Sequence, residues 1–264
     1  MTRLSITSTA NDRLKNVRRL HRRRDRGAFL VERARPLRHA LDGGAPVREV
    51  YAAPELFLGR EDGRLVALAE RRGATVYELS AAAFSSISRS VRPDGLAAIV
   101  ERWRPALGAL RLPARPLVVV AEAIERPGNL GTLVRTACAA DAAAFVVCDG
   151  RTDLFQPDTV RSSVGTLFRV QIAQAGTPAA LAWLRKHGIR VVVATPDGER
   201  PYWKTQYRGA TAVVFGSERY GVSQAWLHAA DETAAIPMSG AADSVNVGVA
   251  AGVFLFEAAR QRLT

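Results

Sequence analysis

The sequence has few of the residues on which several classes of protein depend. Only two of its 264 residues are cysteines, and both stand in apolar surroundings, so neither a disulfide framework nor a metal cluster is indicated. The N-terminus lacks the apolar core of a secretory signal. The longest apolar stretch, residues 247–256, is far shorter than the roughly 20 residues that span a bilayer. We therefore expect a cytoplasmic protein that binds no metal and no membrane.

Acidic residues are also scarce relative to basic ones, and the excess of basic residues is concentrated near the N-terminus. The formal net charge is +12, and residues 1–40 hold twelve Lys or Arg against three acids, which places +9 of that charge in this segment. A concentrated basic excess indicates a polyanionic partner such as a nucleic acid, although a basic protein can also be merely soluble. The arginines that we expect to bind nucleic-acid phosphates are Arg18, Arg22, Arg23, Arg24, Arg26 and Arg35.

The pattern of apolar residues predicts two domains. Hydrophobic residues make up 48% of the chain, enough for packed cores. In residues 1–103, helices expected at 11–24, 37–41, 61–72 and near residue 80 alternate with strands expected at 29–31, 47–52, 75–79 and 96–100. Residues 104–115 contain two internal prolines and a glycine, so they form either a linker or a surface loop within a single domain.

Residues 116–264 are predicted to form the second domain, of the α/β class. Continuous apolar runs at 117–120, 144–147, 190–194 and 212–215 are typical of buried parallel strands. Helical stretches at 130–140, 178–186 and 223–230 separate them. Ligands of such sheets bind beyond the carboxyl ends of the strands, so the loops that follow the apolar runs are where functional residues are expected.

Two of those loops carry polar residues beside glycines. After the first run, Pro127-Gly128 predicts a turn, and Asn129 can cap the next helix. Arg135 adds a cation six residues later, under two helical turns on, and is expected to face the same general side as Asn129. After the run that ends at residue 215, glycines at 216 and 221 bracket Glu218. Taken alone, each pattern is also compatible with an ordinary capped helix or a strand-to-helix loop.

A third segment, residues 236–252, joins a polar loop to an apolar helix of small residues. Ser244 lies in the loop, and Asn246 is expected in the first turn of the helix. Few packed cores need a serine and an asparagine at such positions. The small residues that follow allow another backbone to approach closely, either within the domain or at a helix–helix interface.

Together and in this order, the three segments resemble the signature motifs of the TrmH/SpoU branch of the SPOUT methyltransferases. The matching residues are Asn129, Gly131 and Arg135 in the first motif, Gly216, Glu218 and Gly221 in the second, and Ile236, Pro237, Met238, Ser244, Val245, Asn246 and Val247 in the third. The N-terminal half is similar to the family's substrate-binding domain, which has a fold like ribosomal protein L30e. Arg33 stands where the family usually has glycine, so a turn there is expected to differ.

The resemblance implies a deep trefoil knot in the second domain, with the chain after Ile236 threaded through a loop. It also implies a homodimer that shares its sites, S-adenosylmethionine as cofactor, and methylation of an RNA ribose 2′-hydroxyl. The residues that the resemblance places around the cofactor are Thr195, Gly216, Ser217, Gly221, Ile236, Met238, Val245 and Asn246. Backbone groups in such an apolar segment can hold an adenine edge.

The resemblance also suggests roles for five catalytic residues. None of the four histidines lies in the motifs. The resemblance offers Arg135 as either the base or a phosphate anchor. Because the pKa of an arginine lies far above neutral, it is a poor base, so we expect Arg135 to hold the phosphate beside the target ribose and to stabilise developing negative charge. Asn129, Ser244 and Asn246 would orient the hydroxyl, and Glu218 would hold the loop or Arg135 in place.

Substrate and class remain open at this point. A separate L30e-like domain favours large-subunit ribosomal RNA, for either a housekeeping or an antibiotic-resistance enzyme, over transfer RNA. A non-catalytic RNA-binding protein with the same fold is disfavoured because the polar motif residues are all present. A nucleotide-dependent oxidoreductase needs a Gly-x-Gly-x-x-Gly turn after the first strand, and residues 127–131 do not have that spacing.

Overall fold

The computed structural model describes residues 3–21 and 27–263, and the chain folds into two compact units. Unit 1 is Met1–Trp103 with Phe155–Arg169, and unit 2 is Arg104–Leu154 with Val170–Thr264. Residues 104–115, expected as a linker, belong to unit 2 and contain one short helix, η2 (Leu107–Ala109). Residues 155–169, expected within the second domain, pack with unit 1 instead.

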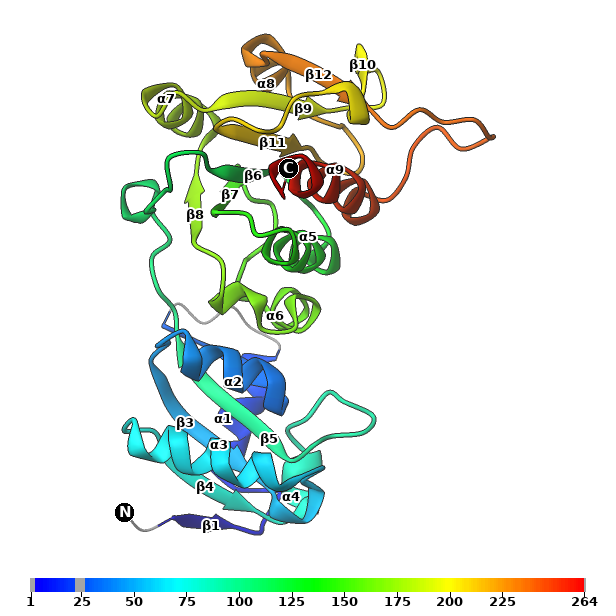
Figure 1. The fold of residues 1–264 in the computed structure, drawn as a ribbon. Helices are drawn as coiled ribbons and strands as arrows, with labels where there is room; N and C mark the ends of the chain where they lie inside the picture. The colour runs from blue at the N-terminus through cyan, green and yellow to red at the C-terminus, as the bar shows by residue number, and fades with distance from the viewer. Residues whose placement is uncertain (1–2, 22–26, 264) are drawn as a thin grey trace. The chain divides into compact units, whose positions relative to one another are not determined.

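Unit 1 is built on a mixed five-stranded sheet (Figure 1). Its strands are β1 (Leu4–Ile6), β2 (Ala28–Glu32), β3 (Val47–Ala52), β4 (Thr75–Leu79) and β5 (Leu96–Glu101), in the order β1-β4-β3-β5-β2. The pairs β1/β4 and β3/β4 are parallel, whereas β5 runs antiparallel to both of its neighbours. Four of these strands match the predicted ranges to within two residues, and the three-residue β1 was not predicted because its apolar pattern is so short.

Helices cover both faces of this sheet. Helices α1 (Asp12–Leu20) and α4 (Ala81–Ser85) bury their apolar residues on one face, and α2 (Ala34–Asp42) and α3 (Arg60–Arg71) on the other. The remaining elements are η1 (Pro54–Leu56), α6 (Pro157–Ser163) and η3 (Thr166–Phe168), of which α6 packs on β2. Helix α1 ends at Leu20, before the predicted end at residue 24, and residues 22–26 lie outside the described part of the chain.

Unit 2 contains a seven-stranded sheet in which every pairing is parallel, as predicted from the apolar runs. The strands are β6 (Leu117–Glu122), β7 (Ala144–Cys148), β8 (Ile172–Ala175), β9 (Arg190–Ala194), β10 (Arg200–Pro201), β11 (Thr211–Phe215) and β12 (Glu232–Ala235). Their order is β10-β12-β9-β11-β6-β7-β8. The chain therefore runs from β6 outward to β8, then crosses to the other side of β6, and loops at such a switch point are the usual ligand site of these sheets.

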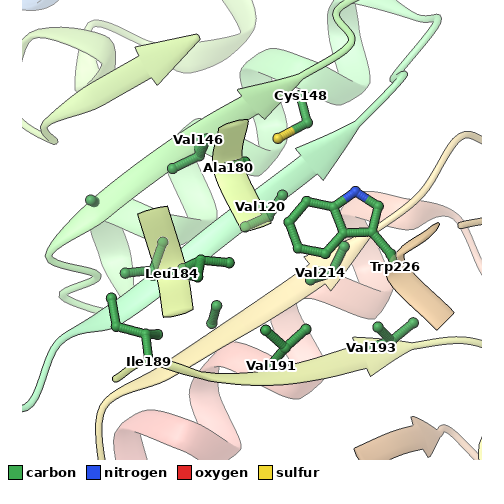
Figure 2. Packing of buried hydrophobic residues seen from close by; sticks show 13 residues of the cluster. Val120, Val146, Cys148, Ala180, Leu184, Ile189, Val191, Val193, Val214 and Trp226 are labelled. Atoms are coloured by element: carbon green, nitrogen blue, oxygen red, sulfur yellow. The ribbon is translucent and has the colours of Figure 1, made fainter. Parts of the chain in front are cut away.

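Helices cover both faces of this sheet as well. Helices α7 (Thr177–Lys186) and α8 (Gln224–Ala229) pack on one face, where Trp226 is fully buried among strand valines (Figure 2). The indole nitrogen of Trp226 donates to Thr177 Oγ1 at 3.0 Å. Helices α5 (Pro127–Ala139) and α9 (Val247–Leu263) lie side by side on the other face (Figure 1). The short helix η4 (Tyr202–Lys204) contacts α9.

Candidate active site

A cavity of about 490 Å³ lies in unit 2 beyond the carboxyl ends of β9, β11 and β12. Its volume falls in the range of roughly 300–1,000 Å³ that is common for small-molecule sites. All three motif segments reach it. The predicted site residues that line it are Asn129, Thr195, Gly216, Ser217, Glu218, Gly221, Ile236, Met238, Ser244, Val245 and Asn246.

The second motif forms a closed turn at the end of β11. The amides and carbonyls of Ser217 and Gly221 exchange two hydrogen bonds of 3.0 Å, and Ser217 Oγ accepts from the Tyr220 amide at 3.0 Å. Gly221 adopts φ +66°, which glycine tolerates without a Cβ clash. A Cβ on Gly216 would stand 2.2 Å from the Gly221 carbonyl carbon, so only glycine fits there. This turn fixes the backbone that carries Glu218.

A directed chain of hydrogen bonds joins one residue from each motif. Glu218 Oε1 accepts from Asn129 Nδ2 at 2.6 Å, and Asn129 Oδ1 accepts from Asn246 Nδ2 at 3.2 Å. Asn246 Oδ1 accepts from the Gly248 amide at 2.9 Å. Because a carboxylate and an amide N–H have fixed roles, this chain sets the orientation of both asparagine amides. Each Nδ2 group retains one further N–H that can face a ligand.

The carboxylate of Glu218 is stabilised in its ionised form. Its Oε2 also accepts from the Glu125 amide at 3.2 Å. Burial acts to raise the pKa of Glu218, but hydrogen bonds from Asn129 and from backbone amides, including those of Glu125 and Arg126, outweigh it, so the pKa lies below its ordinary value. Glu218 is therefore suited to hold Asn129 in place and is a weak proton acceptor near neutral pH.

Two local expectations for the first and third motifs were wrong. Asn129 does not cap a helix: α5 begins two residues earlier, at Pro127, whose fixed φ and missing N–H suit the first helical position. The Asn129 side chain is thereby free to join Glu218. Asn246 lies just before α9, which starts at Val247, and caps it by accepting from the Gly248 amide.

Arg135 is the one predicted catalytic residue that does not line the cavity. It was expected to face the same side as Asn129, but six residues of α-helix turn the chain by about 600°, which leaves the two side chains roughly 120° apart. Arg135 is exposed, and within the described residues its guanidinium forms no hydrogen bond or ion pair.

The cavity also has charged walls that the sequence reasoning did not name. Arg126, Arg219 and Asp243 line it. Arg126 directly precedes Pro127, and Arg219 lies inside the second motif. These positions in the sequence could have indicated that both arginines belong to the site. Arg219 lies over the ring of its neighbour Tyr220, with 5.1 Å between the guanidinium carbon and the ring centroid.

The arginines predicted to bind nucleic acid have different surroundings in unit 1. Arg18 donates to the Thr9 carbonyl and, at 3.1 Å, to Ser86 Oγ, so it ties α1 to neighbouring segments. Arg35 lies exposed on α2 and forms no ion pair with a described residue. Residues 22–24 and 26 lie outside the described part of the chain.

Within the described residues, no group of three or more His, Cys, Asp or Glu gathers as metal ligands would. No helix in the same part of the chain is both long and apolar enough to cross a membrane.

Comparison with known proteins agrees with the geometry. The model of the SpoU rRNA Methylase family matches residues 116–256, and that of the MRM3-like substrate binding domain matches residues 11–98. A curated relative, the 23S rRNA (guanosine(2553)-2′-O)-methyltransferase RlmP of Bacillus subtilis (strain 168), is 30% identical over 95% of this chain and 97% of its own length.

Solved structures resemble the whole chain as well. A crystal structure of an RNA 2′-O ribose methyltransferase is 36% identical, has a TM-score of 0.85 and covers 99% of this chain and 100% of its own. The AdoMet-bound rRNA methyltransferase of Sinorhizobium meliloti is 30% identical with a TM-score of 0.87, and the match covers 98% of both chains. On these matches and the shared motifs, the chain belongs to the SpoU methylase family and carries the family's substrate-binding domain.

Proposed function

We propose that the protein methylates a ribose 2′-hydroxyl of large-subunit ribosomal RNA, with S-adenosylmethionine as methyl donor. The observation that carries this proposal is the hydrogen-bond chain from Glu218 through Asn129 to Asn246, which brings the three motif segments together at the cavity wall. Full-length similarity to RlmP, which is named for 23S rRNA 2′-O-methylation, supports the choice of substrate.

The cavity fits the proposed cofactor in size and chemistry. Its lining combines apolar residues such as Ile236, Met238 and Phe254 with Thr195 and Gly216, a mixture that suits an adenine and its ribose. The charged groups of Arg126 and Asp243 on the same walls suit an amino-acid tail that carries both charges. S-adenosylmethionine supplies an electrophilic methyl group when it is bound there.

The polar residues position the acceptor. The remaining N–H groups of Asn129 and Asn246 and the hydroxyl of Ser244 are available to hold the 2′-hydroxyl and its neighbours. Ionised Glu218 keeps the Asn129 amide in a single orientation. Because positioning supplies much of the rate of such a displacement, a rigid asparagine pair is itself a catalytic device.

Arg135 acts, in this proposal, across a homodimer. It is exposed outside the cavity of its own chain, on α5, and the adjacent helix α9 exposes Val249, Phe256 and Leu263 at seven-residue intervals. A Cβ on Gly252 of α9 would meet nothing within 4 Å, so another backbone can approach closely there. We infer that two copies pair through this stripe and that each Arg135 serves the partner's site, where it holds the phosphate and stabilises negative charge.

Methyl transfer from labelled S-adenosylmethionine tests the proposal. In vitro transcripts of 23S ribosomal RNA and of transfer RNA, which carry no prior modification, are offered separately. Label in 23S RNA that makes one linkage resistant to alkaline cleavage is the expected result. Label in transfer RNA alone would move the substrate to that class, and binding of both RNAs without transfer would favour a non-catalytic RNA-binding protein.

A further inference from the structure

A second cavity, of about 870 Å³, lies within unit 1 and is assigned no role by the proposed chemistry. It is bordered by the start of α2, the loop of residues 89–94 and helix α6. Its floor is apolar, because the buried residues Leu30, Pro36 and Val160 line it together with half-buried Val164. We call it the Arg33 pocket after a residue at its rim.

Arginines surround this apolar floor, and several lack an acidic partner. Five line the pocket: Arg33, Arg35, Arg89, Arg92 and Arg161. Arg161 pairs with Asp158 at 3.0 Å, and Arg89 stands 3.8 Å from the same carboxylate. Among the described residues, Arg33, Arg35 and Arg92 form no ion pair.

The other two carboxylates of the pocket are already engaged. Glu32 accepts from Ser88 Oγ at 2.8 Å and from the Arg89 amide at 3.2 Å. Asp94 accepts from the Ala34 amide at 2.9 Å at the start of α2. These acids hold the pocket's own backbone, so the positive charge of the unpaired arginines is left for an anionic ligand.

The backbone of the pocket is held in costly conformations at two places. Arg33 has φ +83° and ψ 153°, a region that is essentially reserved for glycine, and its guanidinium donates to Ser90 Oγ at 2.9 Å across the rim. Val164, a β-branched residue, has φ +52° and ψ 32°. Such conformations persist where the surrounding structure enforces them, and they gather at ligand sites.

We propose that the Arg33 pocket receives one unstacked nucleotide of the RNA substrate. The base lies against the apolar floor, and the flanking phosphates lie on Arg33, Arg35 and Arg92. Proteins read RNA chiefly at splayed-out bases that stack on side chains or guanidinium planes, while arginines position the phosphates. The proposal rests on the proposed function in taking RNA as the partner, and it gives unit 1 a defined contact.

Binding of a 23S ribosomal RNA transcript, measured by filter retention without S-adenosylmethionine, tests the charged rim. Arg35→Gln and Arg92→Gln should each weaken binding and reduce the slope of log K against log salt by about 0.7–0.9, the share of one phosphate. Arg71→Gln, at an exposed position on α3 outside the pocket, is the matched control and should change binding less. Equal effects of all three substitutions would overturn the proposal.

Arg33→Gly separates ligand binding from folding. Glycine adopts the backbone conformation of Arg33 freely, so the melting temperature should be at or above that of the wild type while RNA affinity falls. With 4-thiouridine in the transcript, irradiation should cross-link RNA to peptides that contain residues 89–94 or 157–164, and this product should fall in Arg33→Gly. Unchanged affinity and cross-linking in this variant would overturn the proposal.

The outcomes also distinguish this inference from the proposed function. If the wild type transfers methyl groups and the three pocket variants keep its KM for RNA, the role of the pocket in RNA binding is contradicted and the proposed function is unaffected. If RNA cross-links in the pocket but the protein transfers no methyl group to any RNA, the role of the pocket in RNA binding is supported and the proposed function is contradicted.

Discussion

Replacement of Glu218 by glutamine tests the hydrogen-bond chain most sharply. The wild-type carboxylate accepts from Asn129 Nδ2 and from the Glu125 amide. A glutamine offers only one oxygen, so one of these donors would face an NH₂ group. Hydrogen bonds to a charged acceptor contribute about 1.5–3 kcal/mol, and partial exposure to solvent reduces the expected loss to about 1–2 kcal/mol. That loss corresponds to roughly 5–30-fold in kcat/KM for RNA methylation.

The assay compares Glu218→Gln with Glu125→Gln. The Glu125 side chain is exposed, and within the described residues it forms no hydrogen bond or ion pair, so its replacement makes the same change of charge close to the site. Steady-state methyl transfer should fall in Glu218→Gln and stay within about twofold of the wild type in Glu125→Gln. Equal rates in the two variants would refute the role assigned to the carboxylate.

The lowered pKa of Glu218 adds a dependence on pH. A carboxyl whose pKa is lower in the folded than in the unfolded protein stabilises the fold above the unfolded pKa, and this stabilisation is lost as the pH falls through the folded pKa. The difference in melting temperature between wild type and Glu218→Gln should therefore be largest near neutral pH. It should narrow below the ordinary pKa of a glutamate, and a difference that widens in acid would contradict the assignment.

Three further predictions follow from the packing. Gly216→Ala should lower the melting temperature and weaken S-adenosylmethionine binding because its Cβ collides with Gly221, whereas Gly209→Ala, whose Cβ meets nothing within 4 Å, should change neither. Phe256→Glu should give monomers in light scattering, whereas Leu58→Glu, at another exposed apolar residue, should leave the dimer intact. Burial and nearby arginines lower the pKa of His39, so stability should rise with pH up to the ordinary histidine pKa and then level off. A His39→Gln variant should flatten that rise in melting temperature.

Much of unit 2 could be predicted because its strands are fully buried. The runs at β6, β7, β9 and β11 were found within one or two residues, and the rule that ligands bind beyond such strands located the cavity. Strands β8, β10 and β12 were missed because they are two to four residues long and include polar residues. These strands form because the fold places them beside their neighbours in the sheet, and their own residues show no strand pattern.

The site residues were predictable by type and less so by arrangement. The order of the motifs brought together Asn129, Glu218 and Asn246, but which amide donates to which oxygen depends on contacts between residues about 90 to 117 positions apart. Asn129 does not cap its helix because Pro127, which suits the first helical position, starts the helix two residues earlier. Arg135 was misplaced for a simpler reason: six residues of α-helix fall short of two full turns, so its side chain lies roughly 120° away from that of Asn129.

The features of unit 1 were the hardest to predict from the sequence. An altered turn was predicted at Arg33 because the family usually has glycine there, but its φ of +83° lies in the region that glycine favours, so the backbone keeps a conformation suited to glycine. Residues 155–169 join unit 1 through aromatic contacts of Phe155 and Phe168 with Phe29 and Trp103. Such contacts between distant segments leave no local signal, so the Arg33 pocket could not be predicted.

The central claim is that the linked asparagines and Glu218 direct methyl transfer to one ribose. Primer extension at low nucleotide concentration on 23S ribosomal RNA, after incubation with S-adenosylmethionine and either wild type or Asn129→Ala, tests it directly. The account predicts one new stop with the wild type and a strongly reduced stop with the variant at equal protein folding and cofactor binding. An equally strong stop with Asn129→Ala, or transferred label that leaves every linkage sensitive to alkali, would contradict the account.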